Sequence, residues 1–175
     1  MSESTPPRQG FVIGLLKDWG VALACALVAW FVWARLFGAS PLSDGPAPDF
    51  TLPEAGGGAP FTLSAAGDGP VVLNFWFTTC PPCRAEIPEL AAFHDANPDI
   101  PIYGVSIDHV SPGRLQKLSQ NLGVNYPVLH DPDSAVAGQY GVTLFPTTIV
   151  VEGGQITEVH QGAIDREGLG RLVGR

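Results

Sequence analysis

The longest apolar stretch of the chain lies near its N-terminus and predicts a membrane-spanning helix. Trp19 to Ala34 form an uninterrupted run of 16 apolar or small residues, and the segment 19–38 contains 20 residues. At about 1.5 Å per residue such a helix is roughly 24–30 Å long, enough to cross a bilayer if Arg35 extends toward its surface. Because the segment is apolar on all faces, an ordinary core helix fits it poorly.

A cleaved signal peptide is the other interpretation of this segment. Gly38 and Ser40 have the small side chains of a cleavage site, but Pro41 is a poor residue to follow the cut. We therefore expect an uncleaved transmembrane anchor over 19–38, preceded by a cytoplasmic segment over 1–18.

Basic residues indicate which way the anchor faces. Arg8 and Lys17 precede it, whereas no Lys or Arg follows Arg35 until Arg84. Because the cytoplasmic flank of a span carries the excess of basic residues, we expect a single-pass protein whose N-terminus is cytoplasmic and whose remaining residues lie outside the cell membrane.

The pattern changes after the anchor. Residues 39–48 are rich in Pro, Gly and Ser and predict a semi-extended tether, and residues 49–175 predict one folded domain. Strand-like pieces at 49–52 and 60–63, separated by three glycines, predict a hairpin. The apolar run Val71–Phe77 predicts a central strand that is buried on both faces.

Helix and strand patterns alternate through the rest of the domain. A helix is expected after this strand, with Pro81 and Pro82 in its first turn and a kink at Pro88. Further strands are expected over 100–107, 126–129, 147–151 and 156–160, and further helices over 111–122, 134–140 and 166–173. This order predicts an α/β sandwich around a mixed sheet.

Charge and cysteine content narrow the possible functions. Residues 41–175 carry 6 basic and 15 acidic residues, a net charge of −9, which argues against nucleic acid as a partner. This part of the chain holds only Cys80 and Cys83, while Cys25 lies in the predicted anchor as an ordinary small residue. With no other pair available for a structural disulfide, we expect this pair to be used chemically.

The motif Cys80-Pro81-Pro82-Cys83 stands where the central strand ends and a helix begins. A helix N-terminus favours a thiolate, and two thiols at this spacing can form a disulfide and reopen it by exchange. A zinc site is the alternative, but it needs two more ligands. The nearest histidine, His94, stands about 16 Å further along the same helix, so we expect no metal.

This arrangement resembles the membrane-anchored TlpA/ResA-like thiol–disulfide oxidoreductases of bacterial envelopes, which have the thioredoxin fold. The resemblance covers about residues 47–173. It rests on the C-x-P-C motif, Glu86, Pro88 and the loop Phe145-Pro146-Thr147-Thr148, whose proline is cis in this fold. It implies a thioredoxin-like α/β domain with a mixed central sheet flanked by helices and an N-terminal β-hairpin extension. Thr79 departs from the family, in which Trp commonly precedes the first cysteine, and bears on substrate preference.

The resemblance also implies roles for the site residues. Cys80 is expected to attack a client disulfide, and Cys83 to resolve the mixed disulfide. Glu86, one helical turn from Cys83, is expected to exchange protons with the buried thiol and to hold the thiol pKa values up; a solvated surface glutamate is the alternative. The residues expected to contact the client are Trp76, Thr79, Pro81, Pro82, Phe145 and Pro146.

The expected function is a thiol–disulfide oxidoreductase that is tethered to the bacterial inner membrane, faces the periplasm and reduces particular protein disulfides. By resemblance, its clients are apocytochrome c or copper-site proteins, and its electrons come from a membrane reductase of the DsbD/CcdA type. No bound cofactor is implied.

Two other functions fit the residues less well. A copper-binding assembly factor would use Cys80, Cys83 and His109 or His130, but such proteins usually have three residues between the cysteines. A thiol peroxidase needs a threonine three residues and a proline seven residues before its cysteine, where this chain has Phe77 and Leu73.

Two polar clusters follow predicted strands. Asp108 and His109 lie where ligands often bind at a sheet edge, although a loop with a helix cap is the simpler interpretation. His130, Asp131 and Asp133 predict a turn.

Overall fold

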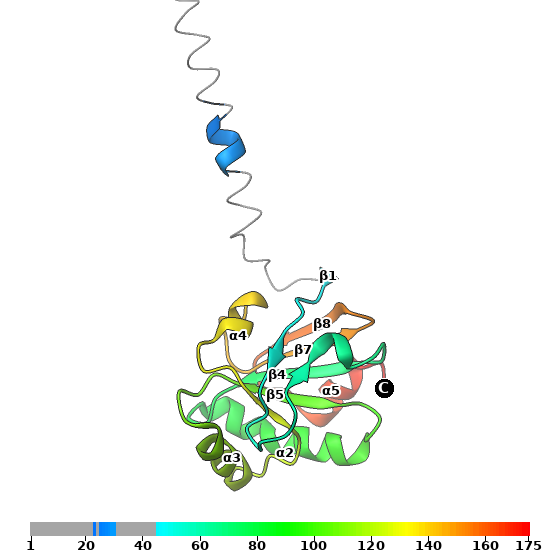
Figure 1. Cartoon of the computed structure of the whole chain (residues 1–175). Helices are drawn as coiled ribbons and strands as arrows, with labels where there is room; N and C mark the ends of the chain where they lie inside the picture. The colour runs from blue at the N-terminus through cyan, green and yellow to red at the C-terminus, as the bar shows by residue number, and fades with distance from the viewer. Residues whose placement is uncertain (1–22, 24, 31–44) are drawn as a thin grey trace, which may run out of the picture. The chain divides into compact units, whose positions relative to one another are not determined.

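The computed structural model describes Leu23, residues 25–30 and residues 45–175 (Figure 1). The chain divides into two units, Met1–Gly38 and Ala39–Arg175. In the first unit, Leu23 and residues 25–30 are helical. Within the described parts of the chain, no helix has the length and apolar character needed to cross a membrane. Most of the predicted anchor over 19–38, and all of the segment 1–18, fall outside the described residues.

A six-stranded mixed sheet forms the centre of the second unit, in the order β1-β8-β7-β4-β5-β6. Strand β4 pairs in parallel with β5 and antiparallel with β7, and β5 pairs in parallel with β6. The strands are β1 (Gly45–Pro46), β4 (Val71–Trp76), β5 (Ile102–Ser106), β6 (Val128–His130), β7 (Thr147–Glu152) and β8 (Gln155–Gln161). The predicted mixed sheet is therefore confirmed.

Helices cover both faces of this sheet. They are the short 3-10 helix η1 (Leu63–Ala65) and the α-helices α2 (Pro81–Ala96), α3 (Pro112–Asn121), α4 (Ala135–Gln139) and α5 (Arg166–Leu172). In Figure 1, α2 and α3 lie below the sheet and α4 lies above it. Within the second unit, α3, α4 and α5 lie within about two residues of the predicted ranges 111–122, 134–140 and 166–173, and α2 begins at Pro81 as expected.

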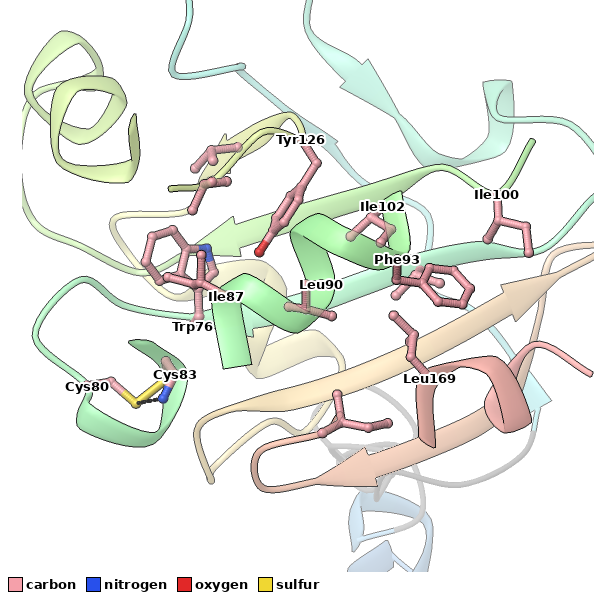
Figure 2. Packing of buried hydrophobic residues seen from close by; sticks show 14 of the residues in the cluster. Trp76, Cys80, Cys83, Ile87, Leu90, Phe93, Ile100, Ile102, Tyr126 and Leu169 are labelled. Carbon is pink, nitrogen blue, oxygen red and sulfur yellow. Dashed lines mark hydrogen bonds between the residues drawn. A yellow bond between two sulfur atoms is a disulfide. The ribbon is translucent and has the colours of Figure 1, made fainter. Parts of the chain in front are cut away.

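Strand β4 shows why the sheet has two buried faces. All six of its residues are buried. Successive side chains of a strand point to opposite faces, so Val72 and Trp76 pack in the core beneath α2, whereas Val71, Leu73 and Phe75 pack in the core on the α4 side. At about 1.5–3 kcal/mol for each fully buried large apolar side chain, this strand anchors the fold. The first core also contains the cysteine pair (Figure 2).

Short strands form a separate two-stranded sheet and one edge of the six-stranded sheet. The predicted N-terminal hairpin is confirmed as the antiparallel pair β2 (Thr51–Leu52) and β3 (Phe61–Thr62). The predicted tether, in contrast, ends earlier than residue 48. Gly45–Pro46 pairs with β8 as β1, and the amide of Ala47 donates to the carbonyl of Gly154 at 2.9 Å. A two-residue strand of Gly and Pro has no periodic pattern, so its sequence gave no sign of this pairing.

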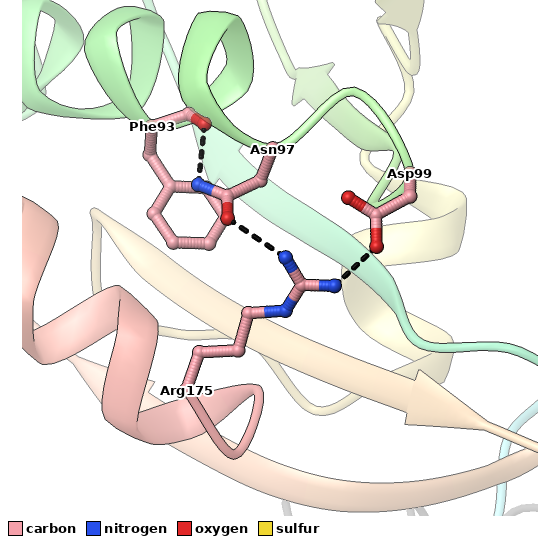
Figure 3. A network of polar contacts seen from close by, with 4 residues as sticks. All are labelled: Phe93, Asn97, Asp99 and Arg175. Carbon is pink, nitrogen blue, oxygen red and sulfur yellow. Dashed lines mark hydrogen bonds and ion pairs between the residues drawn. The ribbon is translucent and has the colours of Figure 1, made fainter.

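The C-terminal residue is tied to the end of α2 by polar contacts (Figure 3). The Arg175 guanidinium donates to Asn97 Oδ1 at 3.1 Å and forms an ion pair with Asp99. Asn97 in turn donates from Nδ2 to the carbonyl of Phe93 at 2.9 Å. Because Arg175 and Asp99 are exposed, this pair contributes at most about 1 kcal/mol.

Candidate active site

Cys80 and Cys83 form a disulfide at the N-terminus of α2, with their Cα atoms 5.3 Å apart. Cys80 is the N-cap, and the backbone N–H of Cys83 donates to its Sγ at 3.2 Å (Figure 2). Pro81 and Pro82 have no N–H, so the amide of Cys83 is the first one that the helix can offer to Cys80. In the reduced protein the same donor and the helix dipole favour a thiolate at Cys80.

The two sulfurs differ little in exposure. Cys80 is 2% exposed and Cys83 is fully buried, so the order is the predicted one, but Cys80 is not an open surface residue in the disulfide form. The side chains around Cys80 are more accessible, because Thr79, Pro81 and Pro82 are all exposed.

Glu86 is buried, and the interpretation of it as a solvated surface residue is wrong. It is 2% exposed on the inner side of α2. Its Oε1 accepts a hydrogen bond from Asn74 Nδ2 at 2.8 Å, and its Oε2 accepts one from the backbone N–H of Ile164 at 3.1 Å. Asn74 also donates to Thr148 Oγ1 at 3.2 Å. Two segments thus hold this carboxyl group directly, and Thr148 helps to hold Asn74 in place.

Burial raises the pKa of Glu86 to about 7, because the ionised form loses its hydration. The hydrogen bonds from Asn74 and Ile164 act in the opposite direction, since they stabilise the carboxylate. A cleft of about 490 Å³ between α2 and α5 is lined by Glu86, Glu89, His160, Ile164 and Asp165 together with their neighbours. The carboxyl group therefore borders solvent-accessible space through which protons can reach it.

The segment before the motif is fixed by Asp108. Its carboxylate accepts hydrogen bonds from the Thr78 amide at 2.8 Å, the Thr78 hydroxyl at 2.7 Å and the Ser106 hydroxyl at 2.7 Å. The expected loop with a helix cap is present: residues 107–110 form the loop, and Ser111 occupies the N-cap position of α3, although its side chain makes no capping hydrogen bond. Asp108 itself holds Thr78 in place, just after the end of β4 and two residues before Cys80.

The loop before β7 lies beside this strand end. The Phe145–Pro146 peptide bond is cis, as predicted, and β7 pairs with β4 so that Thr147 lies opposite Phe75. The rings of Phe145 and Phe77 meet edge to face, with centroids 5.5 Å apart. Pro146 is thereby placed next to the end of β4, close to where the cysteine motif begins.

One of the predicted client contacts is wrong. Trp76 is 1% exposed and packs in the core beneath α2. It shares the inner face of β4 with Val72, so the alternation of the strand already assigned it to the core. Two apolar residues near the motif were missed: Phe77, which is half-buried, and Leu144, which is 51% exposed. The only sequence signals for them are their positions: Phe77 stands three residues before Cys80, and Leu144 stands two residues before Pro146.

The structure also bears on the metal and peroxidase alternatives. In the described part of the chain, no three His, Cys, Asp or Glu side chains are grouped so as to hold a metal ion. His130 is buried, with Nε2 at 3.0 Å from the carbonyl of Asp108, whereas His109 is exposed. Leu73, at the position where a peroxidase needs proline, is fully buried in β4.

Comparison with known proteins decides the family. Residues 44–159 match the AhpC/TSA family. ResA of Bacillus subtilis, a thiol–disulfide oxidoreductase, is 32% identical over 148 residues, which cover 82% of this chain and 82% of ResA. The chain belongs to the AhpC/TSA family and is a ResA-like thiol–disulfide oxidoreductase. ResA of Geobacillus thermodenitrificans gives a similar match, 32% identical over 70% of this chain and 71% of that protein.

Other relatives of this ResA-like chain agree with the fold. A DsbE-type thiol:disulfide interchange protein from Chlorobium tepidum superimposes with a TM-score of 0.68 at 27% identity, covering 77% of this chain and 96% of that one. The DsbE homologue of Paracoccus denitrificans is 36% identical over 57% of this chain, but the match spans only 54% of that protein. The thioredoxin-like fold is therefore shown.

Proposed function

We propose that this ResA-like protein reduces disulfides of client proteins outside the cell membrane, with Cys80 as the attacking thiol and Cys83 as the resolving one. The observation that carries the proposal is the placement of the pair: Cys80 caps α2 and receives the first free amide of the helix at 3.2 Å. A thiolate formed at Cys80 is stabilised there before a client arrives.

The reaction transfers two electrons to the client. The Cys80 thiolate attacks one client sulfur, which forms a mixed disulfide and releases the other client sulfur as a thiolate that takes a proton. Cys83 then loses its proton and attacks the Cys80 sulfur, which releases the second client thiol and leaves the Cys80–Cys83 disulfide. A membrane donor of the DsbD/CcdA type would reduce this disulfide again.

Glu86 is proposed as the group that accepts the proton of Cys83. It stands one turn further along α2, is buried, and has a pKa of about 7, so both its protonation states are populated near neutral pH. The cleft beside it offers an exit for the proton to solvent. We also propose that the client backbone binds beside Cys80, in contact with Thr79, Pro81, Pro82, Phe145 and Pro146.

Membrane attachment through 19–38 and a periplasmic location are further parts of the proposal. The described helical residues 25–30 are apolar and exposed, which supports an anchor. A reporter that is active only in the periplasm, fused after Arg175, should be active and should stay with the membrane fraction in high salt. Release of a soluble form that begins near Pro41 would contradict the anchor.

Apocytochrome c and copper-site proteins remain the proposed clients, by resemblance.

Insulin reduction with dithiothreitol as the electron source tests the chemistry. The full chain should accelerate reduction, Cys80→Ser should remove the acceleration, and Cys83→Ser should halt turnover after one mixed disulfide. Cys25→Ser is the matched control and should retain the full rate, since Cys25 lies outside the folded domain. Full activity of the Cys80→Ser variant would contradict the proposal.

A further inference from the structure

A groove of about 380 Å³ lies directly beside the cysteine motif. Thr79, the residue before Cys80, and Arg84, the residue after Cys83, both line it. The opposite side is formed by α3, which contributes Arg114 and Leu118. The groove is therefore within reach of a peptide segment that is bound at Cys80.

The groove is basic, although the domain around it is acidic. Residues 41–175 carry six basic and 15 acidic residues, and two of the six, Arg84 and Arg114, line this one groove. Both are exposed, and neither forms an ion pair within the part of the chain that the structure describes. Arg171 and Arg175, in contrast, are paired with carboxylates.

One carboxylate also lines the groove, and it is already engaged. Asp108 accepts hydrogen bonds from Thr78 and Ser106 through both of its oxygens, so it holds the loop in place and makes no ion pair with either arginine. Half-buried Val110 and Leu122 form the apolar part of the groove lining and pack against the core. Two guanidinium groups that form no ion pair with any described residue, together with this apolar lining, suit a peptide that carries carboxylates.

We propose that this groove binds the client segment next to the reactive cysteine and that this segment is acidic. The inference rests on the proposed reductase function and adds a chemical class of client to it. An extended segment advances about 3.3 Å per residue, so carboxylates within about three residues of the client cysteine reach Arg84 and Arg114. At physiological ionic strength charges are screened over about 8 Å, so these arginines outweigh the more distant acidic surface.

Rates on three peptides test the inference. Each peptide carries one cysteine in a mixed disulfide with a small neutral thiol, and its flanking residues are Glu, Gln or Lys. The reduced protein should react with the Glu peptide about fivefold faster than with the Gln peptide at 0.15 M salt, from about two exposed ion pairs. The double variant Arg84→Glu/Arg114→Glu should invert this ratio, and higher salt should shrink it in the unmodified protein.

Two matched variants control for net charge. Lys117→Glu changes a charge on α3 away from the groove lining. Arg166→Glu changes an exposed arginine at the start of α5 that forms no ion pair with the residues the structure describes. Both variants should keep the ratio of the unmodified protein. Because each protein is judged by the ratio of its rates on the Glu and Gln peptides, any effect of Arg84 on the reactivity of the thiols cancels. Equal rates on the Glu and Gln peptides, or faster reaction of the Lys peptide, would overturn the inference alone. Reaction with none of the three would overturn the proposed function and the inference with it.

Discussion

Asn74 and Glu86 are joined by a buried hydrogen bond of 2.8 Å that ties the strand leading into the cysteine motif to the helix leaving it. Asn74 is 1% exposed and Glu86 is 2% exposed. The bond stabilises the carboxylate, while burial destabilises it more strongly and raises the pKa of Glu86 to about 7. Because this carboxyl group changes its protonation state near pH 7, both the stability of the fold and the chemistry of the thiols should depend on pH.

The first prediction concerns stability against pH. The pKa of Glu86 is above its unfolded value of 4.5, so the folded state holds the extra proton between about pH 4.5 and 7. This contribution to stability is complete below pH 4.5 and is lost as pH rises through 7, by roughly 3 kcal/mol at most. Urea unfolding from pH 4.5 to 8 should show this loss, and Glu86→Gln should reduce the slope.

Glu89 provides the control for this measurement. It is exposed on the same helix, and its Oε2 accepts the Arg166 amide at 3.2 Å, a bond that a glutamine oxygen can also make. Glu89→Gln should therefore retain the slope of the unmodified protein. If Glu86→Gln leaves the slope unchanged, the buried carboxyl group does not carry a raised pKa.

The second prediction concerns the thiols. Ionised Glu86 opposes negative charge on the neighbouring pair, so Glu86→Gln should lower the titration midpoint of the Cys80–Cys83 pair by about one pH unit. The same variant should slow protein-disulfide reduction at neutral pH, because Cys83 loses its proton acceptor. Thiol absorbance against pH, combined with the insulin rate, measures both effects. An unchanged midpoint and rate would remove Glu86 from the mechanism.

The sequence predicted the elements of this domain far better than the partners of its polar residues. Apolar runs and helical spacing are local properties, so the central strand was found within one residue and the start of α2 at Pro81. The burial of Glu86 depends on Asn74 and on Ile164, which is 78 residues away in the sequence, and no local pattern records such a contact. For the same reason the anchoring role of Asp108 was missed, because its partner Thr78 lies 30 residues earlier.

The third prediction concerns this anchor. Asp108→Ala leaves the Thr78 amide and hydroxyl without their acceptor in a partly buried loop, which should cost about 1–3 kcal/mol of unfolding free energy. Because Thr78 is two residues from Cys80, the rate of disulfide reduction should also fall. Asp133→Ala, at an exposed position, is the control and should change stability by less than about 0.5 kcal/mol. Equal effects of the two substitutions would contradict the anchoring role.

The fourth prediction concerns Tyr126. Within the described residues its buried hydroxyl has no hydrogen-bond partner, whereas the hydroxyl of Tyr140 donates to the carbonyl of Pro48 at 2.8 Å. Tyr126→Phe should therefore stabilise the protein by about 1 kcal/mol, and Tyr140→Phe should destabilise it by a similar amount. Urea unfolding of both variants measures the difference. A clear loss of stability in Tyr126→Phe would show that its hydroxyl is bonded after all.

The central claim is that the Cys80–Cys83 pair is the redox centre and that Cys80 makes the attack. Trapping tests it most directly: the reduced variants Cys83→Ser and Cys80→Ser, each combined with Cys25→Ser so that a single cysteine remains, are mixed with an oxidised client protein, and the disulfide-linked adducts are mapped by mass spectrometry. Cys83→Ser should accumulate a one-to-one adduct through Cys80, because the resolving thiol is absent. Cys80→Ser should give almost none, since Cys83 is fully buried and lies deeper in α2, whereas the exposed residues Thr79, Pro81 and Pro82 lie next to Cys80. An adduct that forms through Cys83 at a comparable rate would contradict the account.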